Sequence, residues 1–256
     1  MNRHTAAVMN KLSPWLATLG FFLIWEASCR VFSIPTFVLP APSDALAALI
    51  KDFDGIWFNA RHTLFTTLCG FAVAIVFGLL LGIVVGASSA VYRALNPLLV
   101  GFNSVPKVAL VPILVLWFGI GTVPAIITAF LVAFFPITVN VATGIATMEP
   151  ELRDVLRSLG AGRIAILTKV GLPRSLPYFF ASLKVAITLA FVGAVISETV
   201  ASNVGIGYLM MSASATFLVP LVFAALLVIA AMGVVMYGIT ALLEKRYAGW
   251  AMRKRR

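Results

Sequence analysis

The most regular feature of the chain is a series of long apolar runs separated by short polar breaks. Each run is close to the roughly 20 residues that a helix needs to cross a bilayer. The pattern predicts an all-α polytopic membrane protein, a single domain over residues 1–256 with about six transmembrane helices. The helices are expected over Leu12–Phe32, Thr63–Ala87, Leu95–Ile120, Val123–Ala146, Tyr178–Val200 and Phe217–Leu243.

The third run is the least regular of the six. Pro106 and Pro112 interrupt it, and Lys107 would lie far from either interface in a continuous span. A second interpretation places Ala94–Ser104 along the inner interface and begins the crossing near Pro106. Lys107 could then extend to the cytoplasmic surface.

Two polar segments between the runs predict surface helices. The first, Ser33–His62, starts with prolines and predicts a short helix with Ser43 as its N-cap. In the second, Glu149–Pro177, apolar residues recur at helical spacing and form one stripe, which predicts an amphipathic helix after Pro150. The stripe is Leu152, Val155, Leu156 and Leu159, and the opposite face carries Arg153, Asp154, Arg157 and Ser158.

The amphipathic helix is expected to end at Gly160 and Gly162, because glycine adopts the left-handed conformation of a helix stop. A second short helix is predicted over Arg163–Val170, at a sharp angle to the first and before Pro173. Two interpretations of the pair are open. It is either an interfacial helix with its arginines among anionic headgroups, or a docking element for a cytoplasmic protein.

Glycines in the second run fall on one helix face. Gly78, Gly82 and Gly86 form two overlapping GxxxG patterns, which let another helix approach closely. We therefore expect this face to pack against a neighbouring helix.

Composition and charge agree with a membrane protein. The 256 residues are 61% hydrophobic and 11% charged, with a mean hydropathy of +1.05. The net charge of +10 comes from basic residues that flank the apolar runs, so nucleic acid is not expected as a partner. With the N-terminus inside, only Arg30, Lys51 and Arg61 fall in outer segments, which predicts that both termini and Glu149–Pro177 are cytoplasmic.

Few polar side chains lie within the runs, and these are the candidates for a translocation path or gate. Glu198 precedes a glycine-marked segment, "TVASNVGIGY", that is expected to fold back toward the outer face. Its alternative role is a structural hydrogen bond to nearby backbone. The other candidates are Asn203, Asn140, for which a hydrogen bond between helices is the commoner role, and Lys107.

The sequence offers no catalytic or metal site. The histidines are His4 and His62, Cys29 and Cys69 lack a CxxC pattern, and no Lys follows a Gly as in a phosphate-binding loop. We expect no catalytic residue, no metal and no cofactor on this chain.

The segment Glu149–Pro177 resembles the EAA loop of permease subunits of bacterial ATP-binding-cassette importers. The corresponding residues are Asp154-Val155-Leu156, then Gly160, then Leu172-Pro173, with Val and Leu where the family has two alanines. The segments "SVPKVALVPILVLWFGIG" and "ISETVASNVGIGYLM" resemble the nitrate, sulfonate and taurine branch of these permeases. The coupling loop implied by the resemblance comprises Arg153, Asp154, Val155, Leu156, Arg157, Ser158, Leu159, Gly160, Ala161, Leu172 and Pro173.

The resemblance implies a type I importer-like fold in the bacterial cytoplasmic (inner) membrane, with lipid around it. Two permease copies, a homodimer, would bind two cytoplasmic ATPase subunits that hold ATP-Mg and would receive solute from an extracytoplasmic binding protein. The solute would be a small sulfonate-, nitrate- or taurine-like anion or a vitamin precursor. The alternatives are a stand-alone secondary transporter driven by an ion gradient and a membrane-embedded enzyme.

Overall fold

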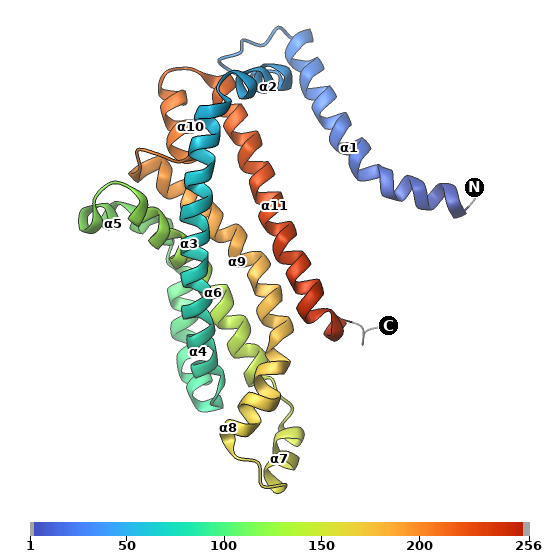
Figure 1. The fold of residues 1–256 in the computed structure, drawn as a ribbon, viewed down its shortest axis with the longest axis vertical. Helices are drawn as coiled ribbons and strands as arrows, with labels where there is room; N and C mark the ends of the chain where they lie inside the picture. Colours follow the sequence, from blue (N-terminus) through green and yellow to red (C-terminus); the bar gives the residue numbers. More distant parts are fainter. Residues whose placement is uncertain (1–2, 253–256) are drawn as a thin grey trace. The chain divides into compact units, whose positions relative to one another are not determined.

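The structure, a computed structural model, describes residues 3–252, and every regular element within that range is helical (Figure 1). The all-α prediction is confirmed for this part of the chain. Residues 1–2 and 253–256 lie outside the described residues, so the cytoplasmic position of the termini stays a prediction. The elements are α1 (Arg3–Val31), α2 (Pro42–Lys51), α3 (Phe53–Gly86), α4 (Ser89–Ser104), η1 (Lys107–Leu110), α5 (Val111–Phe118), α6 (Thr122–Ala146), α7 (Pro150–Ser158), α8 (Arg163–Ile166), η2 (Leu167–Gly171), α9 (Leu172–Ala201), α10 (Ile206–Ala215) and α11 (Val219–Met252).

The chain forms two compact units. Unit 1 comprises Met1–Phe58 and Leu209–Val228, and unit 2 comprises Asn59–Tyr208 and Ile229–Arg256. The helices α3, α10 and α11 each contribute residues to both units. The single-domain organisation over residues 1–256 stays a prediction.

In unit 1, polar bonds join the end of α1 to the first turn of α2. The Glu26 carboxylate accepts hydrogen bonds from the Ser43 N–H at 3.0 Å, the Ser43 hydroxyl at 2.8 Å and Arg30 Nε at 3.0 Å. The N-cap of α2 is Ala41, whose N–H donates to Asp44 at 3.1 Å. The prediction of Ser43 as N-cap was wrong, because Pro42 begins the helix and Ser43 bonds to Glu26 instead.

The core of unit 2 lies among α3, α6, α9 and α11, and it is built largely from small residues. Ala129 and Ala133 of α6 meet Ala186, Ala190 and their neighbours on α9, and all four are fully buried. Small side chains let helix backbones approach closely, which is how helices associate when lipid is as apolar as the core. An ion pair, Lys184 Nζ to Glu244 Oε2 at 2.5 Å, also joins α9 to α11.

The glycine face of α3 lies directly against α6. An added Cβ at Gly82 would be 2.7 Å from the Val141 Cβ and 2.9 Å from the Thr138 carbonyl oxygen. Cβ atoms at Gly78 and Gly86 would each come within 3.0 Å of backbone or Cβ atoms of α6. The close approach of the two helices therefore depends on the missing side chains.

The third predicted span is not one continuous helix. α4 ends at Ser104, and its axis lies at 71° to that of the helical segment Lys107–Phe118. Val105 is extended, with φ −72° and ψ 126°, because the ring of Pro106 disfavours the helical conformation in the residue before it. The prediction of a helix over Leu95–Ile120 was wrong at this point.

The remaining apolar runs agree with the helices observed. Among the described residues, four helices are long and apolar enough to cross a membrane, or five if the bent pair is one span. They are Phe53–Gly86, Thr122–Ala146, Arg163–Ala201 and Val219–Gly249. The first predicted span falls in α1, where the side chains of residues 3–12 are not described, so the total of six stays a prediction.

We expect Gly82→Ala to destabilise the protein, because its methyl group would collide with the backbone and Cβ of α6. The expected loss is about 1–3 kcal/mol of unfolding free energy, the usual cost of overpacking. Gly238→Ala is the matched control in α11, where an added Cβ meets no atom within 4 Å. Thermal unfolding of the purified protein in detergent measures both, and equal midpoints for the two variants would contradict the packing described.

Candidate functional site

The predicted coupling helix is present as α7, and its first turn is fixed to α9. Glu149 is the N-cap residue, and its carboxylate accepts a hydrogen bond from Arg174 Nη2 of α9 at 2.7 Å. Glu151 lies in the first turn, where the helix dipole favours negative charge. The ion pair therefore holds the N-terminal end of α7 beside the start of α9.

The C-terminal end of α7 is closed by a glycine in the left-handed region. Gly160 has φ +82°, its N–H donates to the Arg157 carbonyl at 2.9 Å, and the Ala161 N–H donates to the Leu156 carbonyl at 2.9 Å. This pair of hydrogen bonds is the pattern of a Schellman-type helix stop. Gly162 has φ −70° and serves as the N-cap of α8, so the expectation that both glycines are left-handed was wrong for Gly162.

One face of this loop exposes apolar side chains. Val155 is 55% exposed, Leu159 is 77% exposed and Ile164 of α8 is 78% exposed, whereas Leu152 and Leu156 are half-buried. We call Val155, Leu159 and Ile164 the apolar face of the loop. Among the other predicted loop residues, Asp154, Arg157 and Ser158 are exposed, and Arg153, Ala161 and Leu172 are half-buried.

The second predicted short helix is not separate. α8 continues through the π-helical turn η2 into α9, so that Arg163–Ala201 forms a single run of 39 residues. The first of the two predicted short helices is confirmed as α7, and the expectation that the second is separate from the next span was wrong. Pro173 is tolerated because it lies in the first turn of α9, where the widened turn η2 already interrupts the regular hydrogen bonding.

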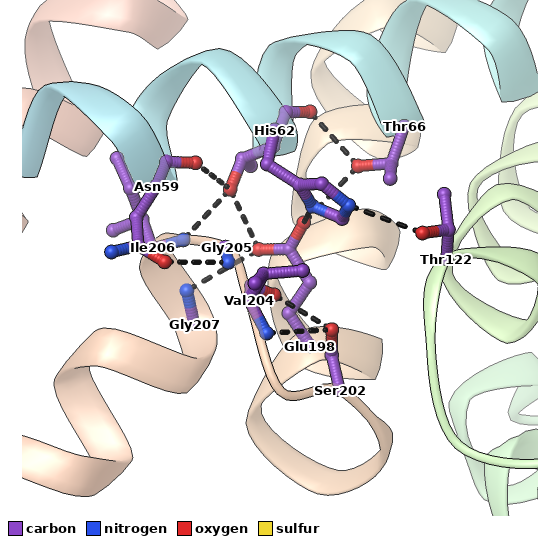
Figure 2. Close-up of polar contacts among 11 residues, drawn as sticks. Asn59, His62, Thr66, Thr122, Glu198, Ser202, Val204, Gly205, Ile206 and Gly207 are labelled. Carbon is purple, nitrogen blue, oxygen red and sulfur yellow. Dashed lines mark hydrogen bonds and ion pairs between the residues drawn. The ribbon is translucent and has the colours of Figure 1, made fainter.

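A second polar site surrounds Glu198, near the end of α9 (Figure 2). Its side chain is 1% exposed, and one carboxylate oxygen accepts a hydrogen bond from the Thr63 hydroxyl at 2.7 Å. The other oxygen accepts from the Thr66 hydroxyl at 3.1 Å and lies 3.8 Å from His62 Nδ1. A buried carboxylate is costly unless donors compensate for the lost water, and α3 supplies these donors.

The same cluster caps the N-terminus of α10. Figure 2 shows three successive N–H groups directed at side chains of α3 and α9. The Gly205 N–H donates to Asn59 Oδ1 at 2.8 Å, the Ile206 N–H to Thr63 Oγ1 at 2.8 Å, and the Gly207 N–H to Glu198 Oε2 at 3.3 Å. The first N–H groups of a helix lack partners within it, so these bonds satisfy α10 from outside.

Two glycines make this approach possible. Gly205 has φ +108°, and a Cβ there would overlap the Glu198 carboxylate. A Cβ at Gly207 would lie 2.8 Å from the Glu198 Cβ and would overlap the Val195 carbonyl oxygen. The chain therefore folds back tightly after α9, as the glycine-marked segment predicted.

The structure does not gather the predicted path residues in one place. Lys107 Nζ donates to the Asn103 carbonyl at 2.9 Å and to Asn103 Oδ1 at 3.0 Å, and it lies 5.7 Å from the centre of the Phe135 ring. Asn140 donates to the Pro136 carbonyl of its own helix at 2.8 Å, so the predicted bond between helices was wrong. Asn203 is exposed in the turn between α9 and α10.

Four polar residues of the cluster were not predicted. Asn59, His62, Thr63 and Thr66 occupy one face of α3, and His62 also pairs with Thr122 at 3.1 Å. Their helical spacing across the start of the apolar run at Thr63 was a usable signal, since a polar stripe in a membrane helix normally faces protein.

Comparison with known proteins places this geometry in context. Residues 74–249 match the family described as binding-protein-dependent transport system inner membrane component. The chain is 32% identical over 240 residues to the formylaminopyrimidine transport permease protein ThiX of Halalkalibacterium halodurans, and this alignment covers 93% of this chain and 96% of ThiX. It is 28% identical over 244 residues to the taurine transport system permease protein TauC of Escherichia coli, and this alignment covers 92% of this chain and 88% of TauC.

The fold has a solved counterpart. A chain of the MetNI methionine ABC transporter in an inward-facing conformation aligns with a TM-score of 0.59 at 18% sequence identity, covering 76% of this chain and 95% of that chain. At this identity the likeness concerns the fold, and it confirms the predicted importer-like fold class. The sequence matches confirm the predicted resemblance to importer permeases.

We expect Thr63→Val to lower the unfolding free energy by about 1–3 kcal/mol, because the Ile206 N–H and the Glu198 carboxylate each lose a buried partner. Thr67→Val is the matched control: Thr67 is equally buried in α3, and its hydroxyl has no hydrogen-bond partner among the described residues. Thr67→Val is expected to be neutral or stabilising. Equal destabilisation of the two variants in thermal unfolding would contradict the capping role.

Proposed function

Since the chain belongs to the family of binding-protein-dependent transport system inner membrane components and is a permease subunit of an ABC importer, we propose that its loop 149–177 binds the ATPase and that its spans carry the solute. The observation that carries the docking role is the apolar face of the loop. Val155 lies in α7, which is anchored at Glu149 and ends at Gly160, Leu159 is the C-cap residue of α7, and Ile164 lies in α8. An amphipathic helix that presents such residues fits a groove on a partner protein.

The assembly proposed for this chain contains four further subunits. A second permease copy completes a homodimer, two cytoplasmic ATPase subunits bind the two loops, and an extracytoplasmic binding protein delivers the solute. ATP-Mg is bound and hydrolysed on the ATPase, and this chain carries no cofactor. Both termini and the loop are cytoplasmic, as the basic residues predict.

The proposed mechanism is alternating access. Closure of the ATPase pair moves the docked loops and shifts the spans between inward- and outward-facing states. The Glu198 cluster is proposed as part of the gate, because it joins α3, the end of α9 and the start of α10 through buried hydrogen bonds. If α9 moves relative to α3, these hydrogen bonds must either break or be kept by a matching movement of α3.

The proposed solute is small, either an anion like taurine or another sulfonate or nitrate, or a vitamin precursor. TauC is named for taurine transport and ThiX for formylaminopyrimidine transport, and the two are similar to this chain to a comparable degree. Lys107 is the candidate for contact with an anion, with Asn140 and Asn203 as further path candidates. The ligand bound by the partner binding protein identifies the solute.

We expect Gly160→Val to abolish copurification of the ATPase while leaving membrane insertion intact. A β-branched residue at φ +82° is strained by roughly 1–2 kcal/mol or more, so the helix stop and the direction of the apolar face would change. Gly162→Val is the matched control, because Gly162 has φ −70° and an added Cβ meets no atom within 4 Å at either glycine. Pull-down of the ATPase with tagged permease compares them, and unchanged binding by Gly160→Val would leave the loop as an interfacial helix only.

We expect transport in liposomes to require the ATPase and ATP. The purified chain alone, with an ion gradient imposed, should accumulate none of the solute that the binding protein delivers to the full assembly. Uptake by the chain alone, driven by the gradient, would establish the secondary transporter and contradict the importer proposal.

A further inference from the structure

A cavity of about 240 Å³ lies beside α7, and the residues of the apolar face, Val155, Leu159 and Ile164, do not line it. The link between α3 and α4, the end of α6, and α7 with α8 and η2 form its walls, all within unit 2. Arg153 and Arg157 of α7 and Arg163 of α8 line the cavity. None of the residues that line it is acidic.

The positive charge of this cavity is largely uncompensated. Arg157 has one recorded ion pair, with Asp154, whose carboxylate is 3.9 Å away and whose side chain is 72% exposed. Glu149 bonds instead to Arg174. Within the described part of the chain, Arg153 and Arg163 form no ion pair. Arg157 and Arg163 are exposed and Arg153 is half-buried, so solvent reduces the repulsion among the three guanidinium groups, and an anion among them would add attraction to each.

Arg153 adds an observation that points to a ligand. Its Nε is buried and has no hydrogen-bond partner among the described residues. Buried N–H donors are nearly always bonded in folded proteins, and a guanidinium offers its donors in a planar fork that matches two oxygens of one tetrahedral group. An oxyanion in the cavity would supply the acceptor that this donor lacks.

We propose that this cavity binds a phosphate group through Arg153, Arg157 and Arg163. A phosphate oxyanion carries enough oxygens for several charge-assisted bonds with arginine. The walls also contain Ile145, Ile166 and Leu167, and Gly86 at the end of an apolar helix, so the cavity lies where a membrane helix gives way to polar chain. Basic pockets at such a position bind anionic lipid headgroups, and a free phosphate offers the same chemistry.

An occupied cavity would add a connection between the loop and the helices beside it. The anion would bond to α7 and α8 while it rests against the α3–α4 link and the end of α6. The loop would then be held against the helices by a charged ligand as well as by the Glu149–Arg174 pair. This role is independent of what binds the apolar face.

The test measures binding to the purified full-length chain after detergent exchange has removed lipid. Native mass spectrometry with phosphatidylglycerol and with phosphatidylcholine detects a headgroup, and thermal unfolding in inorganic phosphate detects the free ion. We expect phosphatidylglycerol to bind the unmodified chain at least about tenfold more tightly than Arg153→Gln/Arg163→Gln. Arg246→Gln is the matched control, because Arg246 is an exposed arginine that does not line the cavity.

Both sources of phosphate would support the proposal, and the assay distinguishes them. Phosphatidylglycerol binding that inorganic phosphate does not displace indicates a lipid headgroup, whereas a raised unfolding midpoint in phosphate, lost in the double variant, indicates the free ion. Binding of phosphatidylglycerol no tighter than phosphatidylcholine, with no effect of phosphate, would overturn the proposal. If the double variant does not fold, the single variants Arg153→Gln and Arg163→Gln each remove one positive charge, and binding unchanged in both would likewise overturn it.

Discussion

Hydrocarbon offers no hydrogen bonds, so every polar backbone group within the membrane must find its partner inside the protein. Continuous helices meet this constraint over most of the chain, and the interesting parts of the molecule are those where a helix stops. After α9 the chain turns back within a few residues, which leaves the first N–H groups of α10 without helical partners. Asn59, Thr63 and Glu198 provide acceptors for three of them. The burial of a carboxylate, which is otherwise unfavourable, is thus tied to the existence of the turn.

The same constraint explains how the helices of unit 2 are packed. Large apolar side chains are solvated as well by lipid as by another helix, so the affinity between helices comes from close backbone contact rather than from hydrophobicity. Alanines line the contact between α6 and α9, and glycines line the contact between α3 and α6. Larger apolar residues such as Phe77, Leu80 and Val84 are exposed on the outer side of α3. The division between small and large residues therefore separates protein-facing from exposed helix surface.

Most of the fold could be predicted from the sequence, because apolar length and 3.6-residue periodicity are local properties. They located α6 and the amphipathic helix α7 to within a few residues, whereas α9 begins six residues before the predicted start and α11 ends nine residues after the predicted end. The break at Pro106 was visible as a possibility, but its angle depends on packing. The continuation of α8 into α9 was missed because a proline was interpreted as a stop, although a π-helical turn accommodates it. The partners of Glu198 could not be assigned, since Thr63 lies 135 residues away in the sequence and only the fold brings them together.

The unbroken helix from Arg163 to Ala201 has a mechanical consequence. At about 1.5 Å per residue, its 39 residues extend over a length on the order of 60 Å, with loop 149–177 at one end and the Glu198 cap near the other. Because one helical run joins the two ends, a rotation of the loop would act on the Glu198 cap through η2 and past Pro177, which lies inside α9. The π-helical turn η2 lies near the loop end, where a change of helical pitch would alter the direction of α9 relative to the loop. The loop and the Glu198 cluster thus lie at the two ends of one continuous helical run.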